Sequence, residues 1–219
     1  MHQQTPLSRR RLIQVSSTLG ACAAVASPAI LRAQTLGAQT LARSVTATAA
    51  PPASPVLAAA RAGLQRAGAR VAHLDVVAVA DFAQASSRPR FHLVDTASGR
   101  VTSLLVAHGR GSDPTHTGWL SRFSNAAGSD CTSEGDYLTA ADYVGKHGLS
   151  IRLTGLDASN NNAEARGIVV HSAPYVSADI VRAHGVLGRS EGCFALSATD
   201  LPQVLQRLGP GRLIVSTKL

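Results

Sequence analysis

Short apolar runs, separated by turn residues about every 8–12 positions, constrain the fold of this chain more than any other feature. Runs of this length and spacing are typical of a sandwich or barrel, so we predict a mainly β fold: a mixed β sandwich or barrel, mostly antiparallel, with a few short helices. Residues 96–99 and 146–148 carry hairpin signals, so the strands on either side of each should pair. The predicted strands are residues 75–82, 89–95, 100–107, 136–144, 149–156, 166–171 and 213–217.

Two segments have the features of helices. Ser54-Pro55 suits a helix start, because Ser is a good N-cap and Pro fits the first turn. Apolar side chains then recur at helical spacing until Gly68. Residues 197–200 favour the start of a second helix over 201–208, which the sequence Gly209-Pro210-Gly211 ends.

The first 33 residues have the three-part layout of an export signal. Residues 8–14 resemble the twin-arginine pattern, an Ala-rich apolar stretch covers 15–30, and cleavage after Ala33 fits the layout. Two alternatives stay open: a lipoprotein-type cleavage before Cys22, and an N-terminus that is not cleaved. We predict an exported protein of the periplasm or cell envelope.

The composition of the chain after residue 33 divides it again and bears on its partners. Residues 34–54 are rich in Ala, Thr, Pro and Ser with no apolar period, which predicts a disordered linker before a domain at 55–219. The formal net charge is +8 for the whole chain and, without the leader, 17 basic against 13 acidic residues leave +4. The basic residues that remain are scattered without aromatic neighbours, which argues against nucleic acid as a partner.

A small-residue turn, Gly188-Arg189-Ser190-Glu191-Gly192-Cys193, places a thiol shortly after an apolar run that ends in His171. A thiol needs a base near neutral pH, because free Cys titrates well above 7, and a His at the end of a buried strand can be that base. Gly192 lets a carbonyl approach the Gly192 and Cys193 amides, which would form an oxyanion hole. The alternatives for Cys193 are a buried structural thiol, or a disulfide with Cys131.

The other histidines do not form the pattern of a metal site. His116, His147 and His184 match no common zinc spacing, and the chain has no HExxH or CxxC motif. We therefore predict no metal site, and the family resemblance described below requires no cofactor.

The segment Ile168-Val169-Val170-His171-Ser172-Ala173-Pro174, followed by Ser190-Glu191-Gly192-Cys193, resembles the L,D-transpeptidases of the YkuD type. Further stretches make the chain similar to the divergent branch called murein L,D-transpeptidase catalytic domain proteins, and the resemblance covers about 75–217. These stretches are residues 106–111, 123–125, 148–153 with 155–156, and 188–190.

The resemblance implies a peptidoglycan L,D-transpeptidase. Cys193 would form a thioester with a tetrapeptide stem and release the terminal D-Ala, and the acyl group would pass to an acceptor amine. His171 would be the base, held through its other ring nitrogen by the Ser172 carbonyl. The family also implies a carbapenem-type β-lactam as inhibitor, and we expect a monomer. Candidate substrate-binding residues are His108, Ser124, Asn125, Arg189 and Ser190.

Three features depart from the better-known branch of the family. Glu191 stands where that branch has His, Ala195 stands where it has Arg or Asn, and the spacing from His171 to Cys193 is longer. Two alternatives follow. One is an L,D-carboxypeptidase, amidase or endopeptidase that uses water as acceptor, and the other, which Ala195 favours, is a non-catalytic wall-binding protein of the same fold.

Overall fold

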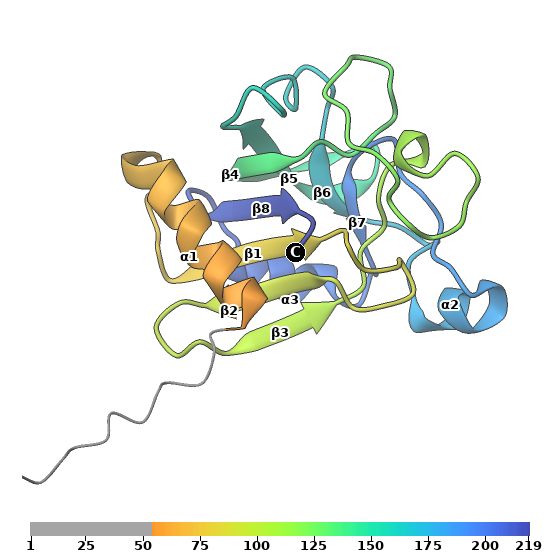
Figure 1. The fold of residues 1–219 in the computed structure, drawn as a ribbon, viewed down its shortest axis with the longest axis horizontal. Coiled ribbons are helices and arrows are strands. Elements are labelled where there is room, and N and C mark those ends of the chain that lie inside the picture. Colours follow the sequence, from red (N-terminus) through yellow and green to blue (C-terminus); the bar gives the residue numbers. More distant parts are fainter. Residues whose placement is uncertain (1–53) are drawn as a thin grey trace, which may run out of the picture. The chain divides into compact units, whose positions relative to one another are not determined.

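The computed structural model describes residues 54–219. The predicted leader, and all but the last residue of the predicted linker, lie outside the described residues. Eight strands form one mixed sheet in the order β3-β2-β1-β8-β4-β5-β6-β7 (Figure 1). The strands are β1 Val76–Asp81, β2 Phe91–Asp95, β3 Val101–Leu104, β4 Gly135–Gly145, β5 Gly148–Gly155, β6 Val169–Ser172, β7 Phe194–Leu196 and β8 Leu213–Thr217.

The pairing of the strands confirms the predicted fold class. Five neighbouring pairs are antiparallel, including both predicted hairpins, and two pairs, β1–β8 and β6–β7, are parallel. The chain continues beyond β3 to a bridge between Ala107 and Ala195 on β7. The rings of Phe91 on β2 and Phe194 on β7 lie 6.5 Å apart. The two ends of the sheet therefore meet around a shared apolar core, which gives the sheet its barrel-like closure.

Strand β1 is buried on both faces because the residues along it alternate between two cores. Ala78 and Ala80 face the core enclosed by the sheet, whereas Val77 and Val79 face helix α1, Pro55–Ala67. Figure 1 shows α1 lying over β8, β1 and β2. At Gly63 a Cβ atom would lie 2.6 Å from Val215 Cγ2, so glycine permits this close approach.

The helices agree with the sequence except at two points. Helix α1 begins at Pro55 as predicted, but the Ser54 side chain makes no capping bond, and the Ser54 carbonyl accepts the Ala58 N–H instead. Helix α3, Leu201–Arg207, also follows the prediction. Helix α2, Ala178–His184, was not predicted; it lies in the connection between β6 and β7 and has no buried residue. Only Ile180 and Val181 pack against the core, and both are just partly buried, so the helix is too short for a helical apolar period to show in the sequence.

The helices of residues 54–219 are short. None of them is long and apolar enough to cross a membrane.

Candidate active site

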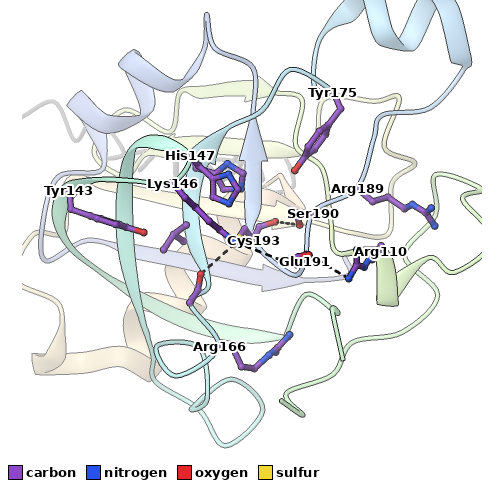
Figure 2. A pocket seen from close by; sticks show the side chains of 13 residues that line it. Arg110, Tyr143, Lys146, His147, Arg166, Tyr175, Arg189, Ser190, Glu191 and Cys193 are labelled. Carbon is purple, nitrogen blue, oxygen red and sulfur yellow. Dashed lines mark hydrogen bonds and ion pairs between the residues drawn. The ribbon is translucent and has the colours of Figure 1, made fainter. Parts of the chain in front are cut away.

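A pocket of about 520 Å³ opens where strands β5, β6 and β7 lie side by side (Figure 2). Its walls come from the β4–β5 hairpin, the segment before β6, the end of β6 and the loop before β7. The lining residues are Arg110, Tyr143, Lys146, His147, Arg166, Gly167, Val169, His171, Tyr175, Arg189, Ser190, Glu191 and Cys193.

The parallel pairing of β6 with β7 brings His171 and Cys193 to this one pocket. His171 lies at the end of β6 and pairs with Ala195, while Cys193 immediately precedes β7. The two residues are 22 positions apart in the sequence, and the loop that carries α2 joins them. The topology therefore supplies the juxtaposition that the sequence alone suggested.

The imidazole of His171 is held in one tautomer by a backbone carbonyl. Its Nδ1 lies 2.8 Å from the Ser172 oxygen, which can only accept, so Nδ1 carries the proton and Nε2 keeps a lone pair. His171 is only 2% exposed. Burial lowers the pKa of His171, and Lys146 and His147 lower it further, whereas the bond to Ser172 opposes these effects. The ring is therefore a neutral base near pH 7.

The thiol of Cys193 is protonated at rest. Its Sγ lies 3.5 Å from the Gly167 carbonyl oxygen, to which the S–H can donate. Burial raises the pKa of the Cys193 thiol, and a backbone bond from Val169 together with Lys146 and Arg166 opposes the rise. A thiol in this environment becomes a nucleophile only when a base removes its proton.

The turn before Cys193 is braced by the hydroxyl of Ser190. Ser190 Oγ donates to the Cys193 carbonyl over 2.7 Å and accepts the Gly192 N–H over 3.1 Å. Gly192 has φ +116°, and a Cβ atom there would lie 2.6 Å from the Cys131 carbonyl oxygen, so only glycine fits. The Gly192 amide, predicted as an oxyanion donor, is thus engaged with Ser190 and would have to exchange that bond for an oxyanion.

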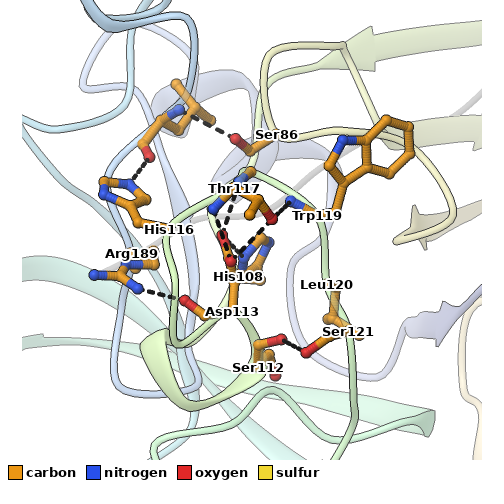
Figure 3. A network of polar contacts seen from close by, with 12 residues as sticks. Ser86, His108, Ser112, Asp113, His116, Thr117, Trp119, Leu120, Ser121 and Arg189 are labelled. Carbon is orange, nitrogen blue, oxygen red and sulfur yellow. Dashed lines mark hydrogen bonds and ion pairs between the residues drawn. The ribbon is translucent and has the colours of Figure 1, made fainter.

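His108 does not line the pocket but belongs to a buried network of polar contacts around Asp113 (Figure 3). Its Nδ1 accepts from the buried Arg90 guanidinium over 2.6 Å, and its Nε2 lies 3.5 Å from Asp113 Oδ2. We treat the longer contact as electrostatic, because Nε2 has no hydrogen-bond partner of good geometry. Burial and the Arg90 charge lower the pKa of His108 to about 4. The His108 carbonyl accepts the Ser190 N–H over 2.9 Å, so this residue supports the Cys193 loop from below.

Ser124 and Asn125 do not line the pocket either. The Asn125 amide donates to the Ala158 carbonyl and to Asn161 Oδ1, over 3.0 and 2.7 Å. The Ser124 carbonyl accepts from Arg166 over 2.9 Å. These hydrogen bonds connect the loop at 124–125 to the turn at 158–161. Arg166, which donates to the Ser124 carbonyl, also lines the pocket.

Most of the charged wall of the pocket was not predicted from the sequence. Arg110, Lys146 and Arg166 join the predicted Arg189 around the pocket, and Glu191 supplies the one carboxylate among the lining residues. Glu191 lies 3.4 Å from Arg110 and 4.0 Å from Lys146. The pocket therefore has a surplus of positive charge and suits an anionic substrate.

One sequence feature, the turn at 146–148, bears on part of this wall, but only together with the strand order. The turn at 146–148 was predicted, and the strand that follows it pairs with β6 so that Ser150 lies opposite His171. Because β5 pairs antiparallel with β6 in this register, the turn that precedes β5 lies next to the end of β6 that carries His171. In the structure the ring of His147 stacks on that of His171, with centroids 4.2 Å apart and planes at 20°.

The remaining thiol and histidines contribute nothing further to the site. Cys131 and Cys193 are both free and buried, so the disulfide left open by the sequence is not formed between them. Within residues 54–219 no group of three or more His, Cys, Asp and Glu side chains is arranged to hold a metal ion.

Comparison with solved structures finds L,D-transpeptidases with low identity. An L,D-transpeptidase from Mycobacterium smegmatis is 18% identical, with 65% of this chain and 58% of that chain covered and a TM-score of 0.41. L,D-transpeptidase 3 from Mycobacterium tuberculosis, in complex with a faropenem-derived adduct, is 18% identical over 66% and 60%, with a TM-score of 0.42. The helical cell shape determining protein Pgp2 from Campylobacter jejuni is 12% identical over 65% and 47%, with a TM-score of 0.43. The chain thus spans less than two thirds of the length of these proteins.

No curated protein matches the chain. A family model described as the L,D-transpeptidase catalytic domain matches residues 53–216, which is most of the chain and runs from before helix α1 into the last strand, β8. The chain therefore belongs to the L,D-transpeptidase catalytic domain family.

Proposed function

We propose that this protein is a peptidoglycan L,D-transpeptidase in which Cys193 is the nucleophile and His171 the base. The observation that carries the proposal is the pairing, in one pocket, of a buried thiol with an imidazole whose Nδ1 is held by a carbonyl. That bond leaves the lone pair of Nε2 for the proton of the thiol.

The reaction has two halves that share the same groups. His171 Nε2 takes the Cys193 proton while the sulfur attacks the carbonyl of the third stem residue. The C–N bond to the terminal D-Ala then breaks, His171 returns the proton to the leaving amine, and a thioester remains. An acceptor amine attacks the thioester and gives its proton to His171, and the thiolate leaves and is reprotonated.

The charge of the pocket supports a substrate with carboxylates. A stem peptide carries a terminal carboxylate, and four cationic side chains line the pocket against one acidic side chain. Of these cations Lys146 has the weakest interactions with the rest of the protein, because its side chain is 76% exposed and its ion pair with Glu191 is 4.0 Å long. We therefore assign Lys146 to the donor carboxylate.

Ala195 bears on the binding-protein alternative. It is fully buried and bridges Ala107 at the closure of the sheet, so no side chain there projects into the pocket. Arg189 lines the pocket, and its guanidinium donates to the carbonyls of Asp113 and Pro114, which fixes its position. We propose that Arg189 takes the role of the polar residue that the better-known branch has two positions after the cysteine.

The setting of the reaction follows from the substrate. Peptidoglycan lies outside the cytoplasmic membrane, so we propose export to the cell envelope by the twin-arginine route. We also propose that the thiol is acylated by β-lactams, because a strained lactam carbonyl presents the same electrophile as the stem amide. A faropenem-derived adduct is described for L,D-transpeptidase 3 from Mycobacterium tuberculosis.

The test is product analysis with purified muropeptides. The protein is incubated with disaccharide tetrapeptides, and the products are separated and weighed by mass spectrometry. We expect cross-linked dimers from the wild type and from Cys193-retaining Cys131→Ala, the matched control for loss of a buried thiol, and none from Cys193→Ala. Tripeptides without dimers would show that water is the acceptor. Unchanged substrate with every protein would contradict catalysis and favour wall binding alone.

A further inference from the structure

The β4–β5 hairpin places a second imidazole against the proposed base. The hairpin turn is two residues long, Lys146 and His147, closed by the pair Gly145 and Gly148. Because β5 runs beside β6, this turn reaches the end of β6, and the rings of His147 and His171 stack 4.2 Å apart at 20°. Figure 2 shows Lys146 and His147 entering the pocket together from the hairpin.

The inference rests on the proposed function of His171. We propose that His147 is a positioning residue for His171: its stacked ring holds one face of the base imidazole, and together with Lys146 it sets the electrostatic surroundings of that imidazole.

The first part follows from the number of points at which the His171 ring is held. The bond from Nδ1 to the Ser172 carbonyl fixes one edge of the ring. The His171 ring is buried, and the stacked His147 ring packs against one face of it as a second point of restraint. His171 and Cys193 line the same pocket, so a ring held in this way keeps a constant orientation toward it.

The second part follows from the charges that face the pair. Lys146 adds a positive charge from the same turn, and both Lys146 and His147 lower the pKa of His171, after the larger effect of burial. The other titratable or charged side chains around the pocket are Tyr143, Cys193, Glu191, Arg166, Tyr175, Arg110 and Arg189. Of these only the Glu191 carboxylate opposes the effect of the cations at neutral pH.

The two parts separate in two variants. His147→Phe keeps a flat ring on His171 but removes the charge, whereas His147→Ala removes both. The full chain is labelled at its histidine rings, and the His171 resonance is titrated by NMR. The rate of Cys193 alkylation by iodoacetamide is measured over the same pH range. His184→Ala, on the exposed helix α2 and outside the pocket, is the matched control.

We expect the titration midpoint of His171 to rise by about half a pH unit or more in both His147 variants. The alkylation rate at about pH 7.5, well below the raised pKa of the Cys193 thiol, should stay within about twofold of wild type in His147→Phe and fall roughly tenfold in His147→Ala. His184→Ala should match the wild type. A midpoint unchanged in both variants, or an alkylation rate unchanged in His147→Ala, would overturn the proposal. Neither readout needs transpeptidase turnover, so an inactive protein that still shows these shifts would refute the proposed function and leave the positioning role intact.

Discussion

Two histidines in this domain begin from the same sequence context and end in different roles. His171 and His108 each follow an apolar run and precede a small residue, and both are almost fully buried, at 2% and 1% exposure. Burial lowers the pKa of both. They differ in the partner of Nδ1, which is the Ser172 carbonyl for His171 and the Arg90 guanidinium for His108.

That single difference decides which atom keeps a lone pair. A carbonyl accepts, so Nδ1 of His171 carries the proton and Nε2 can act as a base in the pocket. A guanidinium donates, so Nδ1 of His108 uses its lone pair on Arg90, and its N–H at Nε2 points toward Asp113. Whether a buried histidine keeps a free lone pair for proton transfer, or uses it in a structural hydrogen bond, therefore depends on whether the partner of Nδ1 accepts or donates.

The largest expected effect is a difference between the two histidines in the rate of Cys193 acylation after substitution. His171→Gln should lower the rate of Cys193 acylation by about 10³-fold, because it removes the base, and change the free energy of unfolding little. His108→Gln should keep most of the acylation rate per folded molecule and lower the free energy of unfolding by about 2 kcal/mol. Single-turnover acylation and denaturant unfolding of both variants check this. Equal losses of rate would show that His108 takes part in the chemistry.

Arg90 should account for much of the stability beneath the pocket. Its guanidinium donates to the Gln84 and Val106 carbonyls as well as to His108. Arg90→Leu leaves these acceptors buried without a donor, so we expect a loss of about 3 kcal/mol in the free energy of unfolding. Arg61→Leu, at an exposed position of α1, is the control and should cost less than about 0.5 kcal/mol. A loss at Arg90 no larger than at Arg61 would contradict the network.

The pH dependence of stability should also distinguish His108. Its pKa is about 4 in the folded chain against 6.5 when unfolded. The unfolded chain therefore binds the proton first, and stability is lost as the pH falls from about 6.5 to about 4, by up to about 3 kcal/mol from this group. Urea unfolding at intervals of pH measures the slope. The slope should flatten in His108→Gln, and an unchanged slope would mean that the buried ring titrates normally.

The smallest effects on acylation rate and stability should follow substitution of Ser190 and Asn125, which were both predicted as substrate-binding residues. Ser190→Ala removes the hydroxyl that braces Gly192 and Cys193, so we expect a roughly tenfold lower acylation rate and about 1 kcal/mol less stability. Asn125→Ala removes only a tie between two loops, so its acylation rate should stay within about twofold of wild type. Acylation kinetics of the two variants decide this, and a reversal of their order would place Asn125 in the site.

The sequence predicted the parts of this molecule that depend on local pattern. The hairpins, the first and last helices and the segments bearing His171 and Cys193 were found because apolar period, turn residues and motif spacing are local signals. Helix α2 was not predicted because none of its residues is fully buried. The part of the pocket wall formed by Lys146 and His147 was not predicted because it depends on which strands become neighbours. His108 was grouped with the pocket because nothing in the sequence shows that Arg90 lies beneath it.

The most direct test of the central claim is the intact mass of the purified protein after incubation with a carbapenem, beside Cys193→Ala and Cys131→Ala. If Cys193 is the nucleophile, the wild type and Cys131→Ala gain the mass of one carbapenem and Cys193→Ala gains none. An adduct that persists in Cys193→Ala, or no adduct on a wild type whose Cys193 is shown to be reduced, would contradict it.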